Sequence, residues 1–339
     1  MSETGAKVGG PGGHFDYLVI GGGSGGVSSA RRAAMHGAKV AIIEGTPNLG
    51  GTCVNVGCVP KKIMFNTAHV NEVIHSSKHY GYTVDKYDFD WGKIKEMRDA
   101  YVRRLNGIYE RNVEKVDATL VYGMATFVDK KKVSVEGVEY TADHILVAVG
   151  GLPMMPDIPG KELCISSDGF FELKTQPKRV AVVGAGYIAV EMSGIFNALG
   201  TETHLFIRHD RAMRTLDPML GEVLDSQMRR AGVNVHSHTS LKKVTKDEDG
   251  RLSLHCANDE VHDGFDEVLM AIGRAPNVGR LNLDVTGMEM TPKNYIKVDE
   301  WQNTNVDGIY ALGTWPGRLS SHQWPSPPGV ACPTDCSPT

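Results

Sequence analysis

The sequence predicts an α/β protein with two doubly wound nucleotide-binding domains of the Rossmann type, the second inserted into the first. Two segments, beginning at Phe15 and Arg179, each read as an apolar strand, a glycine-rich turn and a helix. A later β-rich stretch, Tyr295 to Gly313, has the pattern of a return to the first domain. We therefore expect, in chain order, a flexible leader at 1–14, the first domain at 15–155, the second at 156–288, a return segment at 289–313 and a tail at 314–339.

Composition narrows the class of protein. With 339 residues, 41% of them hydrophobic, the chain can bury two cores. Its formal net charge of -4 argues against nucleic acid or an anionic membrane as the main partner. No apolar run approaches the roughly 18 residues of a membrane span, and the leader has no signal core. Six scattered cysteines do not form a secreted disulfide framework, so we expect a cytoplasmic protein.

The first glycine-rich segment predicts a dinucleotide site. Gly21, Gly23 and Gly26 form GxGxxG between the strand FDYLVI and a helical stretch. The glycines allow a tight turn, close approach of the backbone to a pyrophosphate, and helix packing on the strand. The next strand ends in Glu44, where a carboxylate accepts from a ribose hydroxyl. Because an acid disfavours a 2′-phosphate, the ligand here is FAD or NAD.

A short stretch after Glu44, GGTCVNVGCVPKK, predicts redox chemistry. Cys53 and Cys58 are close enough in sequence to form a small, strained and exchangeable disulfide. The alternatives are a zinc site or two core cysteines, but no second ligand pair stands at metal-ligand spacing, so we expect no metal. A flavin is the cofactor that passes a nicotinamide's electrons to sulfur, which favours FAD at the first site. Lys61 is placed to stabilise a thiolate or a reduced flavin.

The second glycine-rich segment differs in the strand that follows it. Gly184, Gly186 and Ala189 form GxGxxA, but the next strand runs into a basic cluster instead of an acid. Guanidinium groups at this place accommodate a 2′-phosphate, so we expect NADPH here. A solvated basic loop is the alternative, and for Arg211 the better one. The cluster includes Arg208, His209 and Arg214.

Two further interpretations concern side chains near the expected cofactors. Tyr187 lies within the second turn, where it can cover the nicotinamide, and Glu191 is placed to pair with Lys61 across the domains. Tyr101 and Tyr109 lie eight apart on a long helical segment, Trp91 to Lys115, and can reach a substrate, although periodicity alone favours packing.

From Phe15 to Gly313 the chain resembles the glutathione reductases of the pyridine-nucleotide disulfide oxidoreductase family. The resemblance rests on GGTCVNVGCVPKK, SDGFF, GAGYIAVEMSGI, IRHDRAMR and AIGRAPN. Dihydrolipoamide dehydrogenases differ in the redox stretch and have an acid where Arg208 stands. Trypanothione reductases are closer, but Arg31 resembles the glutathione form.

The resemblance implies a relay and a set of contacts. NADPH displaces Tyr187 and reduces FAD, FAD reduces the disulfide through Cys58, Cys53 attacks glutathione disulfide, and Cys58 resolves the mixed disulfide. Lys61 with Glu191 tunes the flavin. Glutathione disulfide contacts Arg31, Tyr101 and Tyr109, whereas Arg208 and Arg214 hold the 2′-phosphate. The further cofactor-binding positions carried over are Ser24, Gly25, Thr52, Ala125, Gly150, Ile188, His209, Gly273 and Arg274.

The resemblance breaks at Thr314, where the family has an aspartate that binds the flavin's ribityl chain. A reading of the codons shifted by one base from Gly313 onward is compatible with the family's own continuation, so we expect residues 314–339 to be out of frame. The family's C-terminal interface domain, which gives a homodimer and a His-Glu acid-base pair to the partner, is then absent. We expect weak FAD binding and little activity of this chain. The alternatives are a non-catalytic fragment that pairs with a full-length subunit, or a thioredoxin or trypanothione reductase relative.

Overall fold

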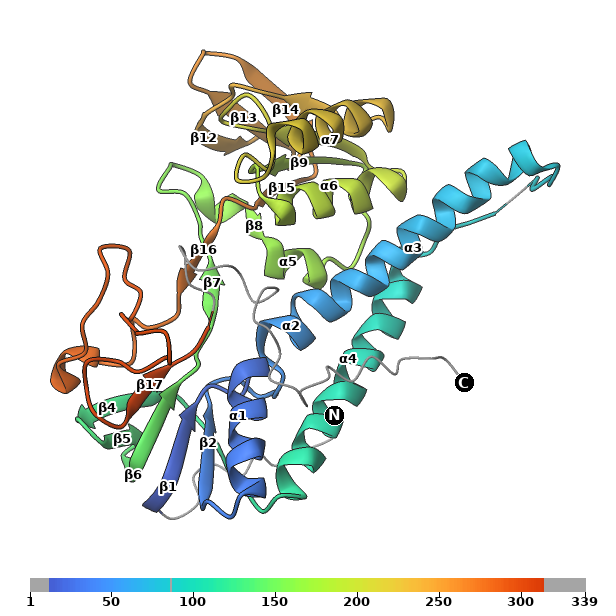
Figure 1. Cartoon of the computed structure of the whole chain (residues 1–339). Helices are drawn as coiled ribbons and strands as arrows, with labels where there is room; N and C mark the ends of the chain where they lie inside the picture. Colours follow the sequence, from blue (N-terminus) through green and yellow to red (C-terminus); the bar gives the residue numbers. More distant parts are fainter. Residues whose placement is uncertain (1–11, 86, 314–339) are drawn as a thin grey trace.

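The structure is a computed structural model that describes residues 12–85 and 87–313. The expected tail and most of the expected leader lie outside these residues. Figure 1 shows two lobes, each built on a sheet, with a long helical arm beside them. Within the described ranges, no helix combines the length and the apolar composition that a membrane crossing requires.

The lower lobe contains a seven-stranded sheet of order β3-β2-β1-β6-β5-β4, with β17 paired to β6. Strands β1, β2, β3, β6 and β17 pair parallel with one another, whereas β4, β5 and β6 form an antiparallel meander. Strand β1 begins two residues before the expected Phe15, because Gly13 and His14 already pair with β6. The strands are β1 Gly13–Ile20, β2 Val40–Glu44, β3 Thr119–Tyr122, β4 Ala125–Asp129, β5 Lys132–Val135, β6 Val138–Val147 and β17 Ile309–Ala311.

The upper lobe contains a five-stranded parallel sheet of order β11-β10-β9-β15-β8. A three-stranded antiparallel sheet, β12-β13-β14, packs beside it through the side chains of Phe206, Leu254 and Phe265. These strands are β8 Ile165–Ser166, β9 Arg179–Val183, β10 Glu202–Phe206, β11 Asn234–His236, β12 Leu241–Lys246, β13 Leu252–Cys256, β14 Val261–Phe265 and β15 Glu267–Met270. The lobe's helices are α5 Ser167–Glu172, α6 Tyr187–Ala198, α7 Pro218–Arg230 and the short η2 Lys161–Leu163.

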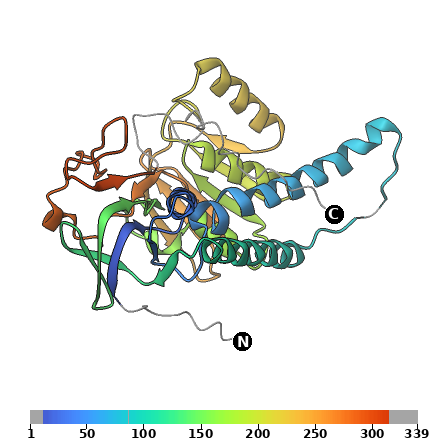
Figure 2. The same cartoon turned by 60° about the horizontal axis from the view of Figure 1, so that its bottom comes forward.

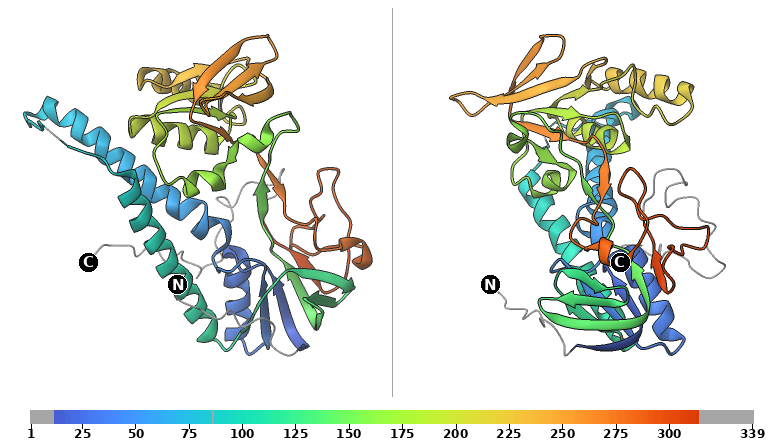
Figure 3. Two further views of the ribbon diagram at one scale, coloured as in Figure 1. Left: turned by 180° about the vertical axis from the view of Figure 1, so that it is seen from behind. Right: turned by 90° about the vertical axis from the view of Figure 1, so that its left-hand side faces the viewer.

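Two short strands join the lobes. Strands β7 (Gly151–Pro153) and β16 (Arg274–Pro276) pair antiparallel, so the chain leaves and re-enters the first lobe side by side. Figure 3 shows this connection from two sides. This is the predicted insertion of the second domain into the first. The return begins earlier than the expected residue 289, because Leu281 and η3 (Leu283–Thr286) already pack on the first sheet. These short segments have no hydrophobic periodicity that would reveal this in the sequence.

The remaining helices cover one face of the first sheet and form the arm (Figure 2). They are α1 Ser24–Met35, α2 Gly51–Asn55, α3 Cys58–Ser76, η1 Ser77–Tyr80 and α4 Trp91–Glu114. Helices α3 and α4 also contribute to the second core: Trp91 stacks on Phe196 with ring centroids 6.0 Å apart and donates from Nε1 to the Leu173 carbonyl at 2.9 Å. The arm therefore fixes the two lobes to each other.

Candidate active site

The first glycine-rich turn lies between β1 and α1. Gly21 has φ +110°, in the left-handed region that favours glycine. A methyl group at Gly26 would overlap the carbonyl oxygen of Gly21. Helix α1 can therefore begin close against the turn, with its first N–H groups free to bind a phosphate.

Glu44 ends β2 and is buried against this turn. Its Oε2 accepts from the backbone N–H of Gly22 at 2.7 Å, and its Oε1 accepts from the N–H and the hydroxyl of Thr46, each at 2.7 Å. A carboxylate has about four lone-pair sites, so it can still accept from a ribose hydroxyl. The glycines and Glu44 together fit the ribose and pyrophosphate of a dinucleotide.

The redox stretch folds as two helices separated by a sharp turn. Cys53 lies in α2 and Cys58 is the first residue of α3. A side chain at Gly57, between them, would collide with the Thr52 carbonyl. The structure holds both cysteines as thiols, Cys53 half-buried and Cys58 exposed.

The two thiols interact directly. The hydrogen bond with Cys58 raises the pKa of Cys53 strongly, with burial as the second cause, while a hydrogen bond with Ser24 acts in the opposite direction. Cys58 has the N-terminus of a 19-residue helix behind it, which favours a thiolate. Cys53 therefore keeps its proton while both cysteines are reduced.

Sequence reasoning missed a pair of asparagines that hold this turn. Asn55 ends α2, and Asn106 comes from α4, where it is 6% exposed. Asn106 Nδ2 donates to the Leu49 carbonyl at 2.8 Å and to Asn55 Oδ1 at 2.9 Å. The sequence does contain a signal for Asn106. This polar residue stands at helical spacing from the apolar Val102 and Val113, on the side of α4 that is buried.

The predicted contact between Lys61 and Glu191 is present. Lys61 Nζ lies 2.8 Å from Glu191 Oε1, with both side chains about a quarter to a third exposed. A second contact joins the same two helices further along, where Asn71 Nδ2 donates to the Ala198 carbonyl at 2.5 Å. Helices α3 and α6 thus pack together from the redox turn to the end of α6.

The second glycine-rich turn lies between β9 and α6. Gly184 has φ +147°, and a methyl group there would overlap the Ala271 carbonyl. No atom lies within 4 Å of the place a Cβ would take at Gly186, so the backbone is open to a ligand. Tyr187 begins α6 and is 57% exposed, with Ile188 next to it. The turn fits a second dinucleotide.

The basic cluster follows β10 at this turn. Arg211 pairs with Asp210 at 2.5 Å, and Arg214 Nε lies 3.5 Å from the same carboxylate. Arg208 is exposed. Desolvation, then the guanidinium groups of Arg214 and Arg208, lower the pKa of His209, so these groups lie near one another. Two positive charges remain after Arg211 and Asp210 are paired, which suits a phosphate dianion.

The three residues expected at the substrate lie on α1 and α4, which pack together. Arg31 has a buried Nε without a hydrogen-bond partner among the described residues. Tyr101 lies below the guanidinium of Arg104, 4.8 Å from ring centroid to Cζ. Tyr109 is half-buried against the core below α1. The structure thus brings the three onto neighbouring helices.

Comparison with known proteins identifies the family to which the chain belongs. A family model for pyridine nucleotide-disulphide oxidoreductases matches residues 15–323. The chain belongs to this family. The glutathione reductase of Schizosaccharomyces pombe (strain 972 / ATCC 24843) is 50% identical to it over 314 residues, covering 90% of this chain and 68% of that protein. The glutathione reductase of Yarrowia lipolytica (strain CLIB 122 / E 150) is 47% identical over 322 residues, with the same shares covered.

Membership of the pyridine nucleotide-disulphide oxidoreductases confirms the fold, the reaction class and the cofactors expected from the sequence. The chain is a disulfide oxidoreductase that uses FAD and NADPH. The two glycine-rich turns fit these groups, because the first has the ribose-binding acid and the second has the arginines.

In this family member, other expected cofactor residues line the junction of the lobes. Arg274 Nη2 donates to Thr52 Oγ1 at 3.2 Å and to the Gly151 carbonyl, and Nη1 lies 3.9 Å from Asp168 Oδ1. Gly150 and Gly273 have φ of +66° and +132°. Gly25 lies in the first turn of α1 against Leu312, whereas Ala125 begins β4.

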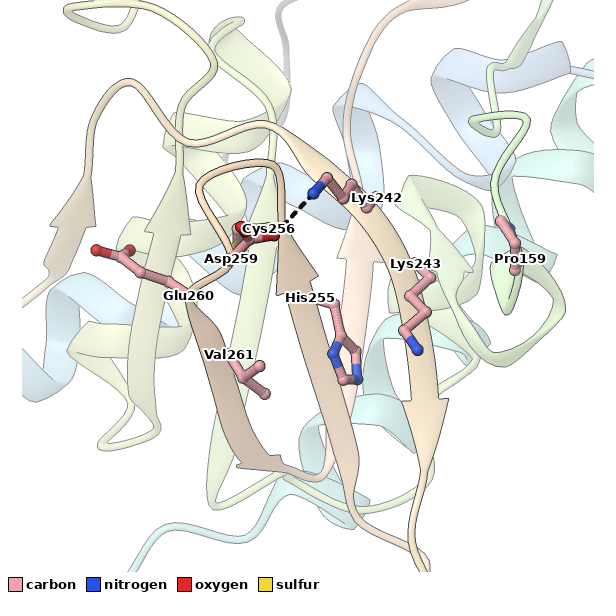
Figure 4. Close-up of a pocket in the computed structure, with 8 residues that line it drawn as sticks. All are labelled: Pro159, Lys242, Lys243, His255, Cys256, Asp259, Glu260 and Val261. Atoms are coloured by element: carbon pink, nitrogen blue, oxygen red, sulfur yellow. Dashed lines mark hydrogen bonds and ion pairs between the residues drawn. The ribbon is translucent and has the colours of Figure 1, made fainter.

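A pocket elsewhere gathers none of the expected site residues. Figure 4 shows a cavity of about 250 Å³ on the three-stranded sheet, lined in part by Lys242, His255 and Cys256. Burial raises the pKa of Cys256, which makes it a poor nucleophile. Over the described ranges, no three His, Cys, Asp or Glu side chains are grouped to hold a metal ion.

Proposed function

We propose that this chain reduces glutathione disulfide with NADPH, through FAD and the Cys53–Cys58 pair. The observation that supports the proposal most directly is the contact between the two thiols at the start of α3, beside the first glycine-rich turn, where Ser24 hydrogen-bonds Cys53. The glutathione reductases of the two yeasts, with 50% and 47% identity, support glutathione disulfide as the substrate.

The protein's own groups divide the sulfur chemistry between them. Cys53 attacks one sulfur of glutathione disulfide, the sulfur–sulfur bond breaks, and one glutathione leaves with a proton. The Cys58 thiolate then attacks Cys53 sulfur in the mixed disulfide, which releases the second glutathione and closes the Cys53–Cys58 bond. Bound FAD, once reduced by NADPH, would supply the two electrons that reopen this bond. Because a thiolate is the attacking form of sulfur, Cys53, whose pKa is raised, gives up its proton as its sulfur attacks.

The remaining site residues position ligands. Lys61 would place a positive charge near a bound flavin, and Glu191 fixes the direction of its side chain through a 2.8 Å contact. Tyr187, exposed at the start of α6, covers the nicotinamide site until NADPH enters. Arg208 and Arg214 bind the 2′-phosphate, whereas Arg31, Tyr101 and Tyr109 bind glutathione disulfide.

Compartment and assembly belong to the same proposal. A dithiol that must cycle suits the reducing cytosol, where structural disulfides are rare. For assembly, the resemblance implies the homodimer of the family, whose interface domain is not among the residues that the structure describes.

A single-turnover experiment tests the substrate. The full chain is supplied with FAD, reduced with one equivalent of NADPH without oxygen, and mixed with glutathione disulfide, oxidised thioredoxin, lipoamide or trypanothione disulfide in separate reactions. We expect glutathione disulfide alone to reoxidise Cys53 and Cys58 rapidly, measured by alkylation and peptide mass spectrometry. Rapid reoxidation by another disulfide, with none by glutathione disulfide, would refute the proposed substrate. Cys53→Ser is the control that should react with none.

A further inference from the structure

Helix α2, which carries Cys53, is held at both ends by one hydrogen-bond network. Asn106 Nδ2 donates to the Leu49 carbonyl, just before α2, and to Asn55 Oδ1, at its end. Asn55 Nδ2 in turn donates to the carbonyls of Leu49 at 3.2 Å and Gly51 at 2.9 Å. The two amides thus connect the start and the end of α2 to α4.

The helix needs this support. It has five residues, far fewer than a helix needs to be stable alone. Gly50 precedes it and Gly51 begins it, both at positive φ, of +106° and +58°. Glycines are the residues about which the chain turns most freely, so α2 has little local restraint of its own.

The network is also costly to leave incomplete. Asn106 is 6% exposed, and a buried amide without partners is strongly unfavourable. The side-chain amide of Asn106 donates both of its hydrogen bonds to the redox turn and none to its own helix. The hydrogen bonds to Leu49 and Asn55 therefore explain why a buried position of α4 is occupied by an asparagine.

We propose that Asn106 and Asn55 act as a positioning pair that keeps Cys53 against Cys58 through the dithiol–disulfide cycle. Closure of a disulfide depends on the effective concentration of one sulfur at the other. Fixing both ends of α2 raises this concentration and so stabilises the disulfide form. The inference rests on the proposed function for its redox pair and adds the residues that set the pair's potential.

The test uses the full chain in a dithiothreitol buffer, which does not involve the proposed substrate. Protein disulfide and reduced dithiothreitol exchange to protein dithiol and oxidised dithiothreitol, a balanced two-electron step. Alkylation followed by mass spectrometry of the peptide with Cys53 and Cys58 gives the equilibrium constant. For Asn106→Ala we expect the closed form to be disfavoured about tenfold, a potential about 30 mV less negative.

A second variant and a control separate positioning from general stability. Asn55→Ala should give a similar shift, and the double variant no larger one, because the two amides act as a unit. Asn197→Ala is the matched control, since Asn197 Nδ2 also donates to a carbonyl, that of Ala231 at 2.9 Å, but in the second lobe. It should leave the potential unchanged. In turnover, the positioning variants should lower kcat and leave KM for NADPH unchanged.

The possible results separate the positioning role from the proposed function. An unchanged potential in folded Asn106→Ala and Asn55→Ala overturns the positioning role, and so does failure of both variants to fold, since the network would then be structural. If only Asn106→Ala fails to fold, the disulfide equilibrium of Asn55→Ala with dithiothreitol tests the positioning role instead. A wild-type pair that neither opens nor closes in the buffer would instead overturn the proposed function.

Discussion

The two glycine-rich turns share a backbone plan but differ in how closely the helix approaches. At the third position of the first turn, a methyl group on Gly26 would overlap the Gly21 carbonyl. The second turn has Ala189 at the same position, fully buried and without conflict. Helix α1 therefore begins closer to its strand than α6 does, although both turns leave N–H groups free for phosphate.

The larger difference lies at the end of the following strand. Glu44 is buried and accepts one hydrogen bond from Gly22 in the first turn and two from Thr46 in its own loop. Arg208, after β10, is exposed within a basic cluster. In both sites the turn is suited to bind pyrophosphate, whereas the strand end selects between the ribose of FAD and the 2′-phosphate of NADPH.

The largest expected effect is at the third turn position. Gly26→Ala should abolish FAD retention and destabilise the fold by about 2–3 kcal/mol, because backbone must move to admit the methyl group. The reciprocal Ala189→Gly should cost only about 1 kcal/mol and keep FAD. Flavin absorbance per chain after gel filtration, with thermal unfolding, measures both. Stoichiometric flavin in Gly26→Ala would show that the two turns are equivalent.

The second prediction concerns the basic cluster. Removing Arg208 and Arg214 together should raise KM for NADPH about 10–100-fold and leave KM for NADH nearly unchanged, because only NADPH has the 2′-phosphate. Arg211→Ala is the matched control, since Arg211 is already paired with Asp210. Steady-state kinetics with both nucleotides decides, and an equal loss for NADH would argue against phosphate selection at the strand end.

The third prediction concerns the acid of the first site. Glu44→Gln should weaken FAD binding by about 1–2 kcal/mol, because an amide nitrogen cannot accept from the loop donors that now face the carboxylate. Glu110→Gln is the control, since Glu110 accepts from the Tyr122 hydroxyl at 2.8 Å and not from the loop. Fluorescence titration with FAD measures the difference. Equal FAD affinities of Glu44→Gln and the unaltered chain would show that Glu44 does not contribute to FAD binding.

The fourth prediction is that lowering the pH destabilises the sheet of the upper lobe before that of the lower lobe. Burial first, then His262 and His204, lower the pKa of His236 from 6.5 to about 4. Between these values the unfolded chain binds a proton that the folded chain does not, so stability present above pH 6.5 is lost as pH falls. After allowance for solvent screening we expect a loss of about 1–2 kcal/mol.

Hydrogen exchange can locate this loss. Protection should fall in β10 and β11 before β1 and β2, and His236→Gln should flatten the dependence. An identical pH slope in the variant would show that His236 is not the group responsible.

The sequence predicts the parts of this molecule that depend on local pattern. Whereas the contact between Lys61 and Glu191, 130 residues apart, is expected through the family resemblance, the glycine turns, Glu44 and the paired cysteines follow from spacing and residue type. The Asn55–Asn106 network does not, because its members are 51 residues apart and hydrogen bonding between them depends on how α4 packs. The junction strand β16 and the early return to the first sheet escape prediction for the same reason, since short irregular segments take their positions from tertiary contacts.

The route of the electrons is the central claim, and an anaerobic titration tests it directly. The FAD-loaded chain, with the Cys53–Cys58 disulfide closed, is treated with one equivalent of NADPH and alkylated. We predict two new thiols, both on the peptide that contains Cys53 and Cys58. Loss of flavin colour with that disulfide still closed would contradict the account.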